Sequence, residues 1–290
     1  GVSCEMTRPR ATAIGFCAVL LWALLALFTV GSAPTPPLLL NSLCFALGGT
    51  LGLLWAAVTG ALPSLRQVPL RVYIFGTLGL FGYHALYFSA LRLAPAAEAG
   101  LIAYLWPLLI VIFSGLLPGE SLRKGHIIGA LLGFAGAALI ITGAGTGFSP
   151  DHLPGYALAG LCALTWSGYS VLSRQIGEVP TASVAIFCLA SAALSLPLHF
   201  IWEETILPTT TLGWAAIAGL GLGPVGLAFY VWDIGVKQGD IQLLGTSSYA
   251  APLLSTLVLV IAGVAAPSFT LLWAAALITG GAAIAARASL

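Results

Sequence analysis

Long apolar segments follow one another along this chain from residue 11 to its end, separated only by short polar breaks. Only 7% of its residues are charged, whereas a soluble protein has about 25%. So few charges cannot cover a surface that faces water, and the apolar stretches extend over far more than one anchor. The sequence therefore predicts an integral membrane protein, with most of the chain in lipid.

The number of apolar segments predicts the number of helices. A bilayer core about 30 Å thick needs roughly 20 apolar residues per helix. Ten segments meet this requirement, so we expect an all-α membrane protein with ten transmembrane helices. Their expected ranges are 11–31, 36–60, 70–91, 96–117, 125–144, 153–174, 180–202, 212–235, 241–263 and 268–286.

Basic residues divide unequally between the two sides that these helices define. If the N-terminus is cytoplasmic, one side carries nine basic residues and the other carries Arg92 alone. The nine are Arg8, Arg10, Arg66, Arg71, Arg123, Lys124, Arg174, Lys237 and Arg287. Because basic residues favour the cytoplasmic side, we expect both termini to be cytoplasmic.

One irregular passage occurs twice. Tyr83–Leu109 and Ala228–Leu254 can be superposed with a shift of 145 residues, which places Tyr104 on Tyr249 and Pro107 on Pro252. We therefore expect a tail at 1–10 and two related halves at 11–147 and 148–290, with five helices each. An odd number of helices makes the second half enter the membrane from the opposite side. Inverted repeats of this kind are typical of secondary transporters.

Other features narrow the classes of protein and site. Met6 is the only methionine, so we expect it to be the natural start and residues 1–5 to be a cloning scar. The five cysteines lack the spacing of a metal site, and no basic cluster indicates nucleic-acid binding. The sequence indicates neither a cofactor nor a catalytic residue, and we expect a monomer.

A family resemblance supports the two-repeat interpretation. The stretch at 90–140 combines an Ala-Leu pair, the mid-helix Pro107, Gly119–Glu120 after the fourth segment and a glycine-rich fifth segment. In this order they resemble an EamA domain of the drug/metabolite transporter superfamily. The second half resembles it more loosely, because Ala265–Ala266 replace the Gly-Glu pair. The aromatic-rich segments most resemble the superfamily's aromatic amino acid exporters. The resemblance implies a multi-pass transporter of the bacterial inner membrane.

The third segment carries a group of polar aromatic residues deep in the membrane. Tyr83 and His84 are each within four residues of Tyr87, so a helix brings them to overlapping faces. His84 lies about 20 Å from the start of its segment, at a rise of 1.5 Å per residue. Polar groups at that depth face the bundle interior or a wet cavity. We expect these residues to contact a substrate, the alternative being a histidine bonded to a neighbouring helix.

Two prolines interrupt corresponding segments. Pro107 and Pro252 each remove one helical hydrogen bond, and the freed carbonyl must find another donor in lipid. Both lie beside polar or aromatic residues, which are Tyr104, Trp106, Ser248 and Tyr249. We expect two kinked helices that flank one cavity.

Two tryptophans lie far from the membrane interfaces that this residue prefers. Trp22 and Trp166 occupy matching positions near the middle of the first and sixth segments. They complete the expected substrate cavity, the alternative being ordinary packing.

These residues lead to a functional hypothesis. We expect export of amino acids, including aromatic and other apolar ones, by alternating access through the cavity. No acid lies at the membrane midplane, which disfavours proton-for-cation exchange through a buried glutamate. The alternatives are export of drugs or other neutral metabolites and, less favoured, a channel or a membrane-embedded enzyme.

Overall fold

The computed structural model describes residues 6–143, 145–176 and 178–290. Every regular element in these ranges is helical and none is a β-strand, which confirms the all-α prediction. The expected cloning scar at 1–5 and the expected end of the fifth segment at Ala144 lie outside the described residues.

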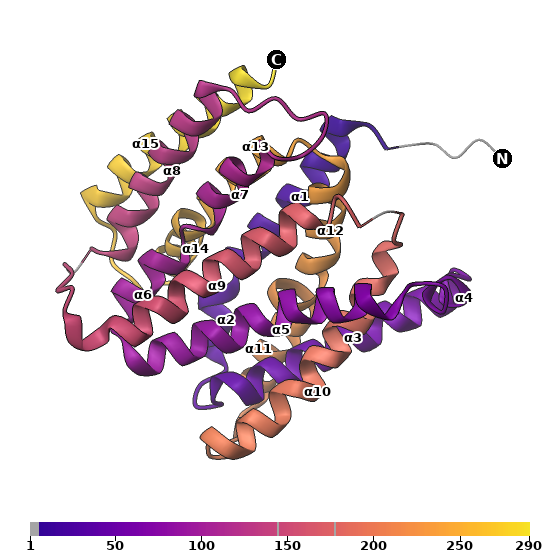
Figure 1. Cartoon of the computed structure of the whole chain (residues 1–290). Helices are drawn as coiled ribbons and strands as arrows, with labels where there is room; N and C mark the ends of the chain where they lie inside the picture. Colours follow the sequence, from indigo (N-terminus) through magenta and orange to yellow (C-terminus); the bar gives the residue numbers. More distant parts are fainter. Residues whose placement is uncertain (1–5, 144, 177) are drawn as a thin grey trace.

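The helices of the first half and of the second half are shown in Figure 1. The first half contains α1 (Arg8–Trp22), α2 (Leu25–Gly31), α3 (Pro37–Val58), α4 (Leu62–Leu65), α5 (Leu70–Leu93), α6 (Ala96–Ala103), α7 (Trp106–Ser114) and α8 (Lys124–Ile141). The second half contains η1 (Pro150–His152), α9 (Leu153–Leu172), η2 (Thr181–Ser183), α10 (Val184–Trp202), α11 (Thr211–Leu222), η3 (Gly223–Leu227), α12 (Ala228–Gln238), α13 (Ile241–Ser247), α14 (Ala250–Ile261) and α15 (Phe269–Ala288).

Most of the predicted segments form helices that are long enough to span a membrane. In the described ranges, 9 helical segments are long and apolar enough to cross a membrane. The predicted sixth segment forms the 20-residue helix α9 but is not among them. α9 nevertheless lies inside the bundle, where it packs against α5, α6 and α7 (Figure 1).

Four of the predicted segments are each broken into two helices. The breaks separate α6 from α7 and α13 from α14, each shortly before the predicted proline. Two further breaks, between α1 and α2 and at η3, were not predicted. At the first, the Leu24 N–H bonds Leu21 O, which tightens the turn. At η3, Val225 is non-helical with φ −114° and ψ 36°, directly after Pro224.

Glycines allow helices of the two halves to touch at the backbone. A Cβ on Gly15 would lie 2.7 Å from the Gly235 Cα, and one on Gly48 would lie 2.8 Å from the Gly226 Cα. Gly129 on α8 meets the backbone of Gly281 on α15 in the same way, and these two helices run side by side (Figure 1). Small residues therefore hold the halves together, as is common in lipid.

A polar cluster joins several helix ends. The Arg174 guanidinium contacts Glu120 and the carbonyls of Val236 and Gly239. Arg8 bonds Glu120 at 3.1 Å. His126 bonds Ser289 at 2.9 Å, so both ends of the described chain lie at this end of the bundle.

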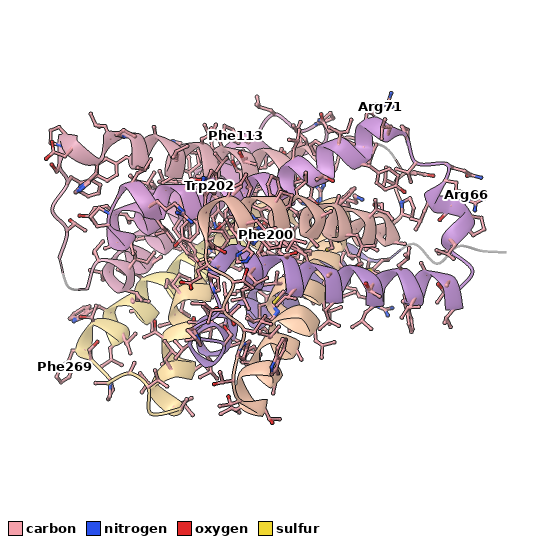
Figure 2. All side chains as sticks on the ribbon, turned by 90° about the horizontal axis from the view of Figure 1, so that it is seen from below. Arg66, Arg71, Phe113, Phe200, Trp202 and Phe269 are labelled. Atoms are coloured by element: carbon pink, nitrogen blue, oxygen red, sulfur yellow. The ribbon has the colours of Figure 1, made fainter. Side chains whose placement is uncertain are left out.

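Figure 2 shows two further basic residues, Arg66 and Arg71, at one end of the molecule and Phe269 at the opposite end. Gln67, which follows Arg66, lines a hollow together with Arg174 of the polar cluster.

The contact between α8 and α15 yields a stability prediction. Gly129→Ala should lower the free energy of unfolding by about 1–3 kcal/mol, because the new methyl group overpacks against the Gly281 backbone. Gly280→Ala is the matched control, since a Cβ there meets nothing within 4 Å. Thermal unfolding in detergent measures both. Equal unfolding temperatures for the two variants would contradict the proposed packing.

Candidate functional site

A cavity of about 540 Å³ lies where the broken helices meet. This volume is within the range of about 300–1,000 Å³ that is typical of small-molecule sites. Its walls come from α1, α2, α5, α7, α8, α9, η3, α12 and α14, and from Tyr104 in the turn between α6 and α7. They are Trp22, Leu25, Ala26, Thr29, Val30, Tyr83, His84, Tyr104, Trp106, Ile140, Ile141, Trp166, Pro224, Val225, Phe229, Ala251, Pro252, Ser255, Thr256 and Leu259.

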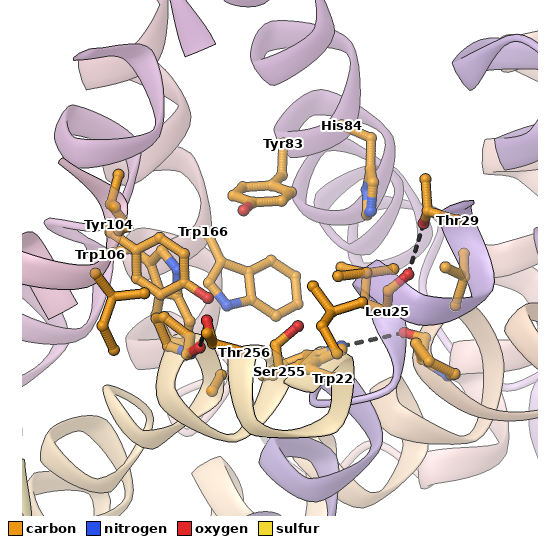
Figure 3. A pocket seen from close by; sticks show the side chains of 18 of the residues that line it. Trp22, Leu25, Thr29, Tyr83, His84, Tyr104, Trp106, Trp166, Ser255 and Thr256 are labelled. Carbon is orange, nitrogen blue, oxygen red and sulfur yellow. Dashed lines mark hydrogen bonds between the residues drawn. The ribbon is translucent and has the colours of Figure 1, made fainter. Parts of the chain in front are cut away.

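Six residues that the sequence singled out line this cavity. They are Trp22, Tyr83, His84, Tyr104, Trp106 and Trp166, and Pro252 joins them. Figure 3 shows the side chains of Tyr83 and His84 extending from α5 toward Trp166 and Trp22. The rings of Trp22 and Trp166 contact each other edge to face, with centroids 6.2 Å apart. Such packing fixes the aromatic walls before any ligand arrives.

Three other predicted substrate residues, and the kink residue Pro107, are absent from the cavity lining. Ser248 is fully buried, and its hydroxyl donates to Leu244 O at 2.7 Å. Tyr87 lies one turn beyond Tyr83 and stacks on it, with centroids 6.3 Å apart and planes 3° apart. Tyr249 is also fully buried. These residues support the cavity from behind rather than line it.

Tyr249 has a defined structural role in that support. Its hydroxyl donates to Tyr104 O at 2.9 Å and accepts from the Leu108 N–H at 3.1 Å. In an unbroken helix these two backbone groups would bond each other. The hydroxyl is thus inserted into the break between α6 and α7 and satisfies both groups, as lipid requires.

The equivalent tyrosine of the first half has a different environment. Tyr104 corresponds to Tyr249 in the repeat, but its ring lines the cavity. The two rings lie 6.5 Å apart, with Tyr249 behind the part of the wall that Tyr104 forms. Repetition of the sequence therefore gave two tyrosines, one of which faces the cavity and one of which holds the backbone.

The break at η3 is completed in a similar way. The Trp22 indole N–H donates to Pro224 O at 3.1 Å, and both residues line the cavity. Trp22 thus connects the broken first segment to the broken eighth segment. The sequence signal for the break at η3 is the run GLGPVG at 221–226, which combines three glycines with a proline.

Sequence reasoning also missed several polar and apolar residues of the wall. Thr29, Ser255 and Thr256 line the cavity, and the last two lie on α14 opposite Tyr83 (Figure 3). Thr29 donates to Leu25 O at 2.6 Å, and Thr256 donates to Pro252 O at 2.8 Å. Ser255 and Thr256 follow Pro252 by three and four residues, which places them on its helical face.

The cavity wall is largely apolar and includes a few polar side chains. Among the described residues that line it, none is Asp, Glu, Lys or Arg. Asp233 forms an ion pair with Lys237 at 3.0 Å, outside the lining. Asp240 caps α13, since its carboxylate accepts from the Leu243 N–H at 3.1 Å. These two carboxylates therefore serve helix ends.

The matches to known proteins agree with this architecture. Residues 10–142 and 153–287 each match the EamA-like transporter family. The chain belongs to this family. The two matched ranges correspond to the two halves that surround the cavity.

Individual EamA-like relatives cover nearly the whole chain. An aromatic amino acid exporter, YddG, of Ancylobacter novellus is 54% identical over 282 residues, which are 97% of this chain and 98% of that protein. The aromatic amino acid exporter YddG of Escherichia coli is 26% identical over 95% of this chain and 96% of its own. A solved crystal structure with 54% identity superposes with a TM-score of 0.94 and covers 97% of this chain and 98% of that one.

Two tyrosine variants separate support from recognition. Tyr249→Phe should lower the free energy of unfolding by about 1 kcal/mol, because Tyr104 O and Leu108 N lose their shared partner in the membrane. Tyr104→Phe should unfold like the unchanged protein, because its hydroxyl makes no hydrogen bond within the described part of the chain. Detergent unfolding curves measure both. The assignment would be wrong if Tyr104→Phe were the less stable variant.

Proposed function

We propose that this EamA-like transporter exports amino acids, including aromatic and other apolar ones, from bacterial cytoplasm. The observation that carries the proposal is a cavity of about 540 Å³ between the two family repeats, walled by aromatic rings and free of charged side chains among the described residues. Apolar rings provide surface for a side chain, and a few polar groups hold the amino acid backbone. Relatives that are named exporters of aromatic amino acids support the same substrate class.

The finer architecture is part of the proposal. We assign α9 as a tenth transmembrane helix, so that each half contains five and the second half is inverted. Three features support this: α9 has 20 residues, none of them Asp, Glu, Lys or Arg, and it packs within the bundle. The matched breaks before Pro107 and Pro252 also support two related halves.

We place both termini in the cytoplasm and the chain in the inner membrane. The polar cluster of Arg8, Glu120 and Arg174 lies at the basic end, which the positive-inside rule assigns to the cytoplasm. The chain would act as a monomer, because the glycine surface of α8 is already occupied by α15.

Two separate hollows in the bundle are consistent with alternating access. The aromatic cavity and a second hollow of about 840 Å³, at the basic end, share no lining residue. Arg174 borders the second hollow and holds Glu120 and Gly239 together. Separation of these contacts would open the bundle toward the cytoplasm, while the central site remains between the repeats.

Other functions find less support. An enzyme would need a nucleophile with a base, or a metal site, and the described residues contain no cluster of metal-binding side chains. A channel would need an open path, whereas the tryptophans contact one another across the cavity. Export of drugs or other neutral metabolites remains the second candidate, because an uncharged aromatic wall also accepts such solutes.

The proposal is tested by counterflow in proteoliposomes. Vesicles loaded with unlabelled phenylalanine should accumulate labelled phenylalanine, and tryptophan and leucine should compete, whereas lysine and glutamate should not. The expected selectivity follows from the lack of charge in the cavity wall. Absence of counterflow for every amino acid, with transport of a drug, would favour the second candidate.

A pair of histidine variants tests the location of the site. His84→Ala should reduce counterflow, normalised to folded protein, more than His199→Ala does, because only His84 lines the cavity. His199 is a demanding control, since it is fully buried and bonds Glu203 and Thr205 instead. Equal normalised activity of the two variants would remove His84 from the substrate site.

A further inference from the structure

The imidazole of His84 has one nitrogen bonded within α5 and one that bonds no other residue of the described chain. Nδ1 lies 2.7 Å from Leu80 O, one turn earlier on α5. A carbonyl oxygen only accepts, so Nδ1 must carry the proton of this bond. In a neutral imidazole the remaining nitrogen, Nε2, is then a hydrogen-bond acceptor.

Aromatic rings hold the imidazole in this orientation. Phe45 lies 5.2 Å away with its plane at 89°, and Phe229 lies 6.0 Å away at 80°. Tyr83 makes a third edge contact, with centroids 5.1 Å apart. With the ring enclosed on these sides and Nδ1 bonded to its own helix, Nε2 is the nitrogen left for a ligand in the cavity.

The surroundings favour the neutral ring. No carboxylate lines the described part of the cavity, so a proton on Nε2 would create an uncompensated charge in the membrane. A cation supplied by a zwitterionic ligand differs in this respect, because it arrives with its own carboxylate. The site thus offers a fixed acceptor for a positively charged donor.

The opposite part of the cavity offers donors. The indole N–H groups of Trp106 and Trp166 donate to no protein atom in the described chain, whereas Trp22 and Trp232 are bonded to Pro224 O and Ser170. Figure 3 shows Trp106 and Tyr104 on one side of Trp166 and His84 on the other. Tyr83 and Phe229 each contact both Trp166 and His84, so a single ring separates these two residues, and Trp106 contacts the far side of Trp166.

We propose that His84 Nε2 accepts a hydrogen bond from the substrate's α-ammonium group, while Trp106 and Trp166 donate to its carboxylate. This inference rests on the proposed function and adds the chemical selection that the site makes. It would admit intact α-amino acids and discriminate against the same side chain without its ammonium group. His84 would then act as a specificity residue whose proton stays on Nδ1, instead of a carrier of protons.

Three matched ligands test the assignment on the full chain. Phenylalanine, 3-phenylpropionate and phenethylamine share one ring and differ only in the ammonium and carboxylate groups. Titration calorimetry of the detergent-purified protein should show phenylalanine binding about tenfold more tightly than 3-phenylpropionate, as expected for one hydrogen bond to a charged group.

Variants test the ammonium-binding residue and the carboxylate-binding residues separately. His84→Leu should weaken phenylalanine binding about tenfold and change 3-phenylpropionate binding by less than about twofold. His84→Gln, which offers an amide oxygen, should recover part of the loss and controls for shape. Trp166→Phe should weaken phenylalanine and 3-phenylpropionate but leave phenethylamine unchanged.

Two results would overturn the inference. One is that 3-phenylpropionate binds the unchanged protein as tightly as phenylalanine does. The other is that His84→Leu weakens both ligands by the same factor, which would make the ring only a part of the wall. If none of the three ligands bound the unchanged protein, the proposed function itself would fail, and this assignment with it.

Discussion

Backbone groups released by helix breaks inside a membrane need new partners, and the cavity of this protein depends on how they are found. A free carbonyl or N–H in lipid costs several kcal/mol. Here the Tyr249 hydroxyl serves both sides of the break between α6 and α7, and the Trp22 indole serves Pro224 O at η3. The breaks are thereby stable, and they give space to a cavity that continuous helices would fill.

The same solution links structure to substrate chemistry. Trp22 both satisfies a carbonyl at a break and forms part of the wall, since it bonds Pro224 O and contacts Trp166. A wall built this way is rigid, apolar and free of charge in the described residues. The polar atoms that it leaves unbonded are then few, and their positions determine which solute is accepted.

Most of the helices could be predicted from the sequence, because a helix that spans a membrane requires a long apolar run. Each of the ten apolar runs is helical in the structure, although α9 is not one of the 9 candidate membrane spans. The two prolines predicted two of the four breaks. The other two breaks, a tightened turn after Trp22 and the non-helical Val225 that follows Pro224, lie away from the two prolines on which the prediction rested.

Cavity-lining residues were predicted best where a side chain with a polar group lies in the middle of an apolar segment. Tyr83, His84 and Trp166 are out of place deep in lipid, and they line the cavity. Ser255 and Thr256 were missed because hydroxyls that bond their own helix are common in membranes. Tyr249 and its repeat partner Tyr104 each precede a proline by three residues, so this shared pattern did not separate their roles; in the structure α8 packs against Tyr249 through Gly133 and Phe134.

The central claim, that the cavity among the broken helices holds an aromatic amino acid, is tested most directly by locating a heavy-atom substrate. Crystals grown with 4-iodophenylalanine should show one strong anomalous peak within the cavity, between Trp22, Tyr104 and Trp166. A peak confined to another surface, or no peak at a concentration that saturates counterflow, would contradict the account.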